Sequence, residues 1–350
     1  MVEKQTLLSE RETGIDLFRL LGLLFVNGLH AFLYNGFYSA PQAGAALWLA
    51  NSFRWLFFGC NGMFMLLTGY LKTKKAWGKG YYKGLLAVLV GYALTCVISY
   101  PIRYFLIGEK DGLSVWVERF FTFSNYAWYV EMYIGLILIS PLINLALDSL
   151  QSSKSVLLLT GSVVLATNLP SITPLKLLPD WWVNMYPIGY YMIGAAIRRT
   201  NPKIPSVAGL LGAALCAMGM GLASLLTAGG GKFNDGFSQG GYGGFWTTLM
   251  VTCLFLGVYR LKAGKRAGKV LSFCAAGVFE GYILSRLLDV WVYKTVRFWH
   301  RPEKYILVFL CVTIPVFLTS MLIGKLVHTL SLRITTPKKN NQQQNLSVSK

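Results

Sequence analysis

The sequence predicts an all-α integral membrane protein that crosses the bilayer about ten times and keeps both termini in the cytoplasm. Hydrophobic residues make up 54% of the 350 residues and charged residues only 13%, too few for the surface of a water-soluble fold. Long apolar runs recur along the whole chain, and lysine and arginine gather in alternate connections between them. This composition excludes a DNA-binding protein, a disordered chain and a secreted disulfide scaffold.

Ten apolar runs have the composition of transmembrane helices, which need about 20 residues to span a hydrocarbon core of roughly 30 Å. They lie near 15–35, 46–71, 84–107, 126–147, 155–170, 183–198, 206–228, 243–261, 271–294 and 304–330. The fifth run is short, and the Pro- and Trp-rich stretch 170–187 is typical of a re-entrant or interfacial segment. Segment 113–123 combines apolar side chains with two charges, which favours a position at the outer interface.

The distribution of basic residues predicts the orientation. With a cytoplasmic N-terminus, the inner connections hold about 20 lysines and arginines and the outer ones about 6. We therefore interpret the net charge of +19 as cytoplasmic loop charge, and we expect membrane lipid but no nucleic acid as a partner. The expected organisation is a cytoplasmic segment over 1–14, one transmembrane domain over 15–330 and a disordered cytoplasmic tail over 331–350.

The sequence shows no metal-binding pattern. Its six cysteines stand singly inside apolar runs, without a CxxC or a Cys/His cluster at metal-ligand spacing, so we expect buried thiols and no metal site. It also lacks a Walker loop and a GxGxxG that follows a strand. We therefore expect no soluble nucleotide-binding domain and no permanently bound cofactor.

The first apolar run carries ionisable groups, which are costly in a membrane and usually face a cavity or a partner. Arg19 and His30 are eleven residues apart, which is close to three helical turns and a rise of about 16.5 Å. Both side chains therefore point to the same side, with Arg19 near the cytoplasm and His30 in the outer third. The alternative is that Arg19 reaches the lipid headgroups and His30 is a hydrogen-bonded interfacial histidine.

Two further runs that enter from the outside carry polar groups. Arg54, Asn61 and Thr68 follow one another at intervals of seven and form one polar stripe. For Asn61 and Thr68, polar contacts between packed helices are an equally good explanation. Glu131 lies about five residues inside its run, at the depth of His30, and is a candidate to orient the imidazole. A structural ion pair between Glu131 and Arg54 is the alternative.

The ninth run adds a third set of polar groups. Tyr282, Ser285, Arg286 and Asp289 are spaced to share one helical face, with Arg286 and Asp289 one turn apart as an expected pair. Together with His30, Arg54 and Glu131, they predict a polar chamber that opens outward.

The predicted cytoplasmic side is strongly basic next to these runs. Basic groups there suit a phosphorylated donor, although ordinary positive-inside charge would also account for them. The candidate donor-binding residues are Lys72, Lys74, Lys75, Lys79, Lys83 and Arg198.

Four segments make the sequence resemble the membrane acyltransferase-3 family, whose bacterial members transfer acyl groups, usually acetyl from acetyl-CoA, to cell-surface sugars. They are GIDLFRLLGLLFVNGLH (14–30), NGMFMLLTGYL (61–71), AWYVEMYIGLILISPLIN (127–144) and YPIGYYMIGAAIRR (186–199). The most specific of these features is the Arg-x10-His spacing. Together the segments extend over most of the chain.

The resemblance implies that His30 is the catalytic base or acyl carrier and that Arg19 is its partner towards the donor. Where family members often have Arg-x-x-Arg after the second span, this chain has Lys83-Gly84-Leu85-Leu86-Ala87, so the nearby lysines would replace it. Where many relatives have a histidine in the ninth run, this chain has Ser285.

The sequence thus predicts a transmembrane O-acyltransferase of the bacterial cytoplasmic membrane. Acyl-CoA would bind on the inner side, and a glycan hydroxyl would accept the acyl group on the outer side, near Arg54, Asn61, Tyr282 and Arg286. A transporter or flippase, and a sensory membrane domain without activity, are the alternatives, and the chain is compatible with a homodimer.

Overall fold

The structure of the protein is a computed structural model that describes residues 13–78, 80–124, 127–172, 177–236, 241–295, 307 and 309–335. These residues form helices and turns, and no β-strand occurs among them. The first half holds α2 (Thr13–Tyr34), α3 (Ala45–Phe58), α4 (Cys60–Lys72), α5 (Lys83–Pro101) with η2 (Ile102–Ile107), α6 (Leu113–Phe121) and α7 (Trp128–Asp148). The second half holds α8 (Ser153–Asn168), α9 (Tyr186–Thr200), α10 (Ser206–Ala228), α11 (Phe245–Val258), α12 (Lys265–Ala275), α13 (Val278–Thr295), η7 (Phe309–Thr313) and α15 (Ile314–Thr335).

Several helices are long and apolar enough to cross a membrane, so the chain is a multi-pass membrane protein. Among the described residues there are five such helices, or six if α12 and α13 are counted as one span bent by 61°. The five are α2, α5 with η2, α7, α10, and η7 with α15. Each of the other predicted runs also contains a helix, but α8, α9 and α11 are shorter, and the predicted count of ten is not confirmed.

Two predicted spans are broken rather than straight. The run 46–71 divides into α3 and α4 at Gly59, whose amide N–H bonds to the Leu56 carbonyl in one tighter turn. A side chain at Gly59 would meet Val251 of α11 at 2.8 Å, so this position also allows close packing. The run 271–294 begins on α12 and bends into α13.

The first and last described helices extend past residues 15 and 330, the predicted limits of the transmembrane domain, which stay a prediction. Thr13 and Gly14 already belong to α2, and residues 331–335, expected in the tail, form the last turn of α15. The remainder of both predicted terminal segments lies outside the described residues. Within 170–172 and 177–187, the described parts of the Pro- and Trp-rich stretch, lie the short 3₁₀ turns η3 (Leu169–Ser171) and η4 (Asp180–Met185) and the start of α9.

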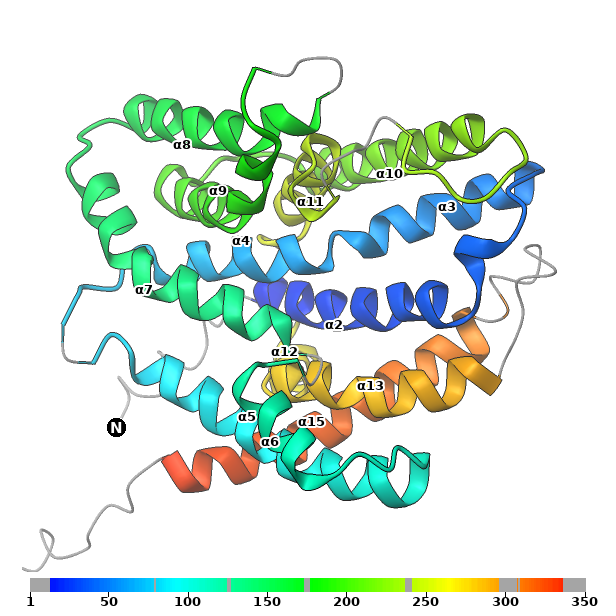
Figure 1. Ribbon diagram of the computed structural model, residues 1–350. Coiled ribbons are helices and arrows are strands. Elements are labelled where there is room, and N and C mark those ends of the chain that lie inside the picture. The colour runs from blue at the N-terminus through cyan, green and yellow to red at the C-terminus, as the bar shows by residue number, and fades with distance from the viewer. Residues whose placement is uncertain are drawn as a thin grey trace, which may run out of the picture.

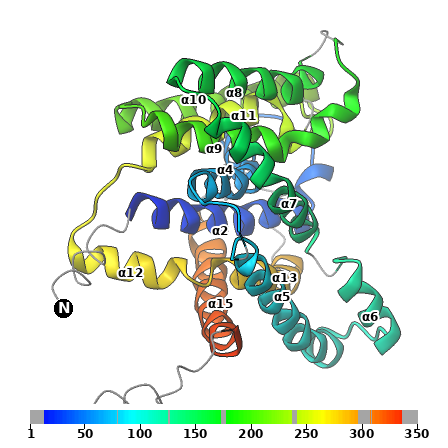
Figure 2. The same cartoon turned by 90° about the vertical axis from the view of Figure 1, so that its left-hand side faces the viewer.

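The central helix of the fold is α2. Figure 1 shows α2 beside the broken α3–α4 pair, with α8 to α11 above them and α5, α13 and α15 below. Figure 2 shows α12 running across the direction of α15. Because α2 packs against α3 and α4 on one side and against α13 on another, its polar residues face protein rather than lipid.

Connections that were predicted to share a side of the membrane contact one another. On the predicted inner side, the Thr13 hydroxyl donates to the Leu261 carbonyl at 3.0 Å, and Arg199 bonds to Thr73 and to Asp148. On the predicted outer side, connection 36–45 meets connection 229–242 through a backbone bond from Gln42 to Gly231 at 2.8 Å. These contacts support the alternation of the loops, while the assignment of the two faces to cytoplasm and exterior stays a prediction.

Helices α4 and α9 approach so closely that only glycine fits at their crossing. A Cβ at Gly69 would lie 2.0 Å from the Tyr191 carbonyl oxygen, and one at Gly194 would lie 1.9 Å from that of Leu66. Small residues of this kind let helix backbones pack in a membrane, where burial of apolar surface gives little driving force.

We expect Gly194→Ala to destabilise the protein, because the added methyl group must push α9 away from α4. Overpacking of this kind costs about 1–3 kcal/mol and should lower the thermal unfolding midpoint in detergent by about 1–4 °C. Gly161→Ala on α8, where an added Cβ meets nothing within 4 Å, is the matched control and should keep or raise the midpoint. Equal midpoints for the two variants would contradict this packing.

Candidate active site

A buried histidine–carboxylate pair lies where α2 and α13 pack together. His30 Nδ1 is hydrogen-bonded to Asp289 Oδ2, and both side chains are buried. Tyr293, one turn beyond Asp289, donates its hydroxyl to the Asn27 carbonyl of α2 at 3.2 Å, which fixes the register of the two helices. The pair is therefore held by the packing of the two helices and not by a flexible loop.

This geometry determines what the imidazole can do. Because Nδ1 faces a carboxylate, the neutral ring carries its proton on Nδ1 and leaves the lone pair on Nε2. The carboxylate also stabilises the imidazolium that forms when Nε2 accepts a proton. The pair thus has the arrangement of a general base and the group that orients it.

Two cavities with part of their lining in common lie near this pair. The larger has a volume of about 550 Å³ and is lined by Arg19, while the smaller, of about 100 Å³, is lined by His30. Asn61 and Tyr282 line both cavities and so form the boundary between them. Arg19 and His30 thus each line one of two adjacent cavities.

The larger cavity is amphipathic. Leu67, Val88 and Phe279 form part of its apolar lining, and Tyr129 and Tyr133 bring phenol groups. Arg19 is half-buried in its wall and pairs with Asp16 one turn earlier on α2, at 3.2 Å. Such a cavity suits a ligand that has an apolar body and an anionic end.

The structure gives the place beside His30 to a carboxylate other than the predicted one. Glu131 has an exposed side chain on α7, a helix that packs on α4 and α9, whereas Asp289 comes from α13, which packs along α2. An equal depth in the membrane does not make two helices neighbours. The predicted pairing of Asp289 with Arg286 is thus replaced by its bond to His30, and Arg286 lines neither cavity.

Arg54 lies in an aromatic cage rather than in the cavity wall. Its guanidinium lies 4.1 Å from the ring centroid of Trp55, 4.4 Å from that of Phe58 and 4.6 Å from that of Phe233. Its ion-pair partner is Asp235 of the predicted outer connection, at 3.6 Å, and not Glu131. Phe58 of the cage stacks on Tyr242, and Tyr242 lines the smaller cavity. One aromatic ring therefore lies between the cage and that cavity.

None of the predicted donor-binding residues that the structure describes lines the larger cavity. Lys72 is partly buried, its ammonium 5.4 Å from the ring centroid of Tyr81, while Lys74, Lys75 and Lys83 are exposed. Lys79 lies outside the described residues. Arg198 donates to the Tyr70 hydroxyl at 2.9 Å and is thus bound to α4.

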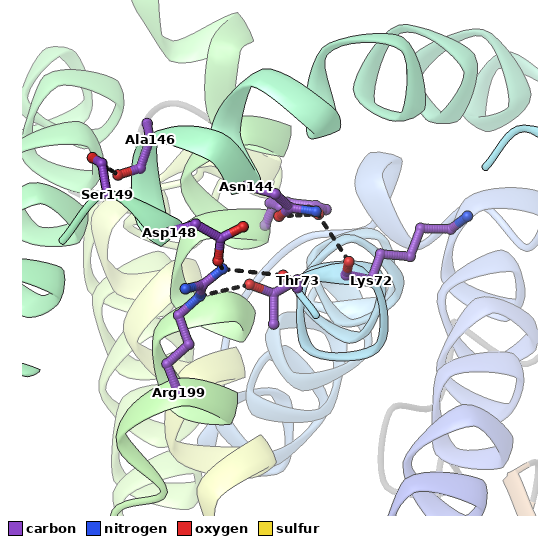
Figure 3. Close-up of polar contacts among 8 residues, drawn as sticks. Lys72, Thr73, Asn144, Ala146, Asp148, Ser149 and Arg199 are labelled. Atoms are coloured by element: carbon purple, nitrogen blue, oxygen red, sulfur yellow. Dashed lines mark hydrogen bonds and ion pairs between the residues drawn. The ribbon is translucent and has the colours of Figure 1, made fainter. Parts of the chain in front are cut away.

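Arg199 fixes the start of this basic connection. Its guanidinium donates to the Thr73 hydroxyl at 2.8 Å and to the Thr73 carbonyl at 3.1 Å, and it pairs with Asp148 at 2.7 Å. Asn144 of α7 donates to the Lys72 carbonyl at 3.0 Å. Figure 3 shows these contacts joining α4, α7 and α9, with the Lys72 side chain extending away from them.

We expect Arg199→Ala to loosen the connection that follows α4. Losing three hydrogen bonds raises the population of locally open states, so trypsin should cleave after Lys74 and Lys75 about tenfold faster. Arg260→Ala is the matched control, because Arg260 bonds to Asn201 instead. Equal cleavage rates in the two variants would show that Arg199 does not anchor the connection.

A second histidine–carboxylate pair, which the sequence interpretation missed, borders the larger cavity. His328 of α15 lines the cavity, and its Nδ1 lies 2.9 Å from Oε1 of the buried Glu280 on α13. Lys325, one turn before His328, also lines the cavity. Ionisable groups in the last apolar run were the available signal, since such groups usually face a cavity.

The described residues hold no group of three or more His, Cys, Asp or Glu side chains that could bind a metal ion. The described residues thus form a multi-pass membrane protein with two histidine–carboxylate pairs beside its cavities.

The sequence profile of the acyltransferase 3 family, described as an acyltransferase domain, matches residues 12–325. The chain therefore belongs to this family, and its class is that of a membrane acyltransferase. No curated protein and no solved structure matches the chain. Both helices of the His30–Asp289 pair lie within the matched residues, whereas His328 lies three residues beyond them.

Proposed function

We propose that the protein is a transmembrane O-acyltransferase of the bacterial cytoplasmic membrane. It moves an acyl group, with acetyl as the first candidate, from cytoplasmic acyl-CoA to a hydroxyl of a cell-surface or lipid-linked glycan. The supporting observation is that the cavity lined by Arg19 and the cavity lined by His30 share two lining residues, Asn61 and Tyr282. A thioester in the first cavity and a hydroxyl in the second would meet at this boundary.

In the proposed reaction, His30 Nε2 accepts the proton of the acceptor hydroxyl while the oxygen adds to the thioester carbonyl carbon. The tetrahedral intermediate then breaks its carbon–sulfur bond, and the departing thiolate takes the proton from His30. Asp289 stabilises the imidazolium between these two transfers. Acyl-CoA and alcohol are thereby converted to ester and CoA, and His30 returns to its starting state.

The remaining polar groups support this path. Asn61 and Tyr282, at the boundary of the two cavities, can donate hydrogen bonds to the oxyanion of the intermediate. The exposed lysines after α4 and Arg198 would raise the local concentration of an anionic donor through their charge. Arg54 and Arg286, which line neither cavity, are proposed to hold an anionic group of the acceptor outside the smaller cavity.

Proteoliposomes test this function against transport. Protein is reconstituted with labelled acetyl-CoA on its cytoplasmic face and a lipid-linked glycan from the expressing cells in the bilayer. We expect labelled ester on the glycan and free CoA in equal amounts, with no ester when acetyl-CoA is omitted. Movement of glycan without acetyl-CoA, and without ester formation, would instead identify a flippase.

A further inference from the structure

The wall of the larger cavity carries more cationic groups than the proposed reaction uses. Arg19 of α2 and Lys325 and His328 of α15 all line this cavity. Arg19 pairs with Asp16 and His328 with Glu280, whereas Lys325 makes no ion pair among the described residues. Its ammonium lies 4.8 Å from the ring centroid of Phe273. Lys325 is therefore the cation of this cavity wall that no described carboxylate pairs with.

Glu280 keeps the second histidine in place. It is 3% exposed, and its Oε2 has no hydrogen-bond partner, so its contact with His328 is the polar contact that offsets its burial. Gly91 of α5 lies against Oε1, since a Cβ there would be 3.0 Å from it. With Glu280 confined between α5 and α15, His328 Nδ1 is occupied, and the remaining ring edge can point to the cavity.

The two histidine pairs are separated along one helix. Glu280 and Asp289 both belong to α13 and are nine residues apart, a rise of about 13.5 Å. The pantetheine arm of acyl-CoA has about twelve skeletal bonds between its phosphate oxygen and its sulfur, as many as four residues of extended chain, and reaches about 14 Å. Because nine residues make two and a half turns, Glu280 and Asp289 project from opposite sides of α13, and the arm matches only the axial offset between the two pairs.

We propose that Arg19, Lys325 and His328 form the binding site for the phosphates of the donor thioester, with Glu280 as the positioning residue for His328. The inference rests on the proposed function and deepens it. It assigns the phosphates to cations of the cavity wall instead of the lysines after α4. Guanidinium, ammonium and imidazole N–H groups are the donors that phosphate oxygens prefer in proteins.

The test compares two donors in Lys325→Gln and His328→Gln proteins. With acetyl-CoA, we expect each substitution to raise KM about tenfold, the effect of one charge-assisted hydrogen bond, and to change kcat by less than about twofold. With acetyl-pantetheine, which lacks the phosphates, both variants should match the parent protein. An unchanged KM for acetyl-CoA, or equal losses with both donors, would overturn the proposal.

Two exposed positions provide controls. Lys154→Gln removes one positive charge from α8 on the predicted inner side, and Thr329→Ala changes the residue next to His328. Both proteins should keep the parent KM. If the parent transfers no acyl group from either donor, the proposed function fails. In that case, calorimetric titration of the purified proteins with CoA still decides this inference, because weaker binding by the two variants supports it and equal binding overturns it.

Discussion

His30→Ala is expected to lower the rate of acyl transfer by about 10²–10⁴-fold, the usual effect of losing a general base. The variant removes the only group that we place within reach of the acceptor proton, while the cavity that holds the donor is unchanged. The measurement is release of CoA by purified protein in the presence of acceptor, together with the KM for acetyl-CoA, which should stay within about threefold of the parent value.

The folding of this variant must be checked separately, since His30 is buried and hydrogen-bonded. Size-exclusion chromatography and thermal unfolding establish whether it is folded, and His30→Gln, which keeps a polar side chain near Asp289, is the conservative companion. A folded His30→Ala protein that forms ester at the parent rate would remove the mechanism. It would not remove the family assignment, which rests on residues 12–325 as a whole.

The second large effect is expected from Asp289→Asn. An amide keeps the shape of the side chain but removes the charge that stabilises the imidazolium, and it can impose the other tautomer on His30. We expect the transfer rate to fall by about 10²–10⁴-fold with little change in the KM for acetyl-CoA, measured by the same CoA-release assay.

Glu131→Gln is the matched control for this change. It removes the same charge from the carboxylate that shares the predicted depth of His30 but has an exposed side chain on α7. Its transfer rate should stay within about threefold of the parent rate. The reverse result, a large loss for Glu131→Gln and a small one for Asp289→Asn, would restore the pairing expected from the sequence and refute the one in the structure.

Some parts of the site follow from helical periodicity alone. The eleven-residue interval between Arg19 and His30 predicts that both lie on one face of α2, and in the structure each lines one of two adjacent cavities. Asn61 and Thr68, seven residues apart on α4, were assigned to one polar stripe, and both line the larger cavity. In each case the relevant geometry belongs to a single helix, which is what a sequence pattern describes.

Other parts depend on which helices adjoin. The sequence paired Asp289 with Arg286 because they are one turn apart, and it assigned Glu131 to His30 because their depths agree. In the structure, α13 packs along α2 and supplies Asp289 instead. His328 was overlooked for the same reason, since its relation to Glu280 exists only where α15 packs against α13.

The sequence by itself determined that this chain is an all-α, multi-pass membrane protein, since apolar length and composition are properties of each segment alone. Its ordered motifs also indicated the acyltransferase 3 family. Only the tertiary structure decided which carboxylate meets His30, where two spans break, and which basic residues line the larger cavity. The physical reason is that lipid and protein interior are equally apolar, so the pattern of a membrane helix does not reveal its neighbours.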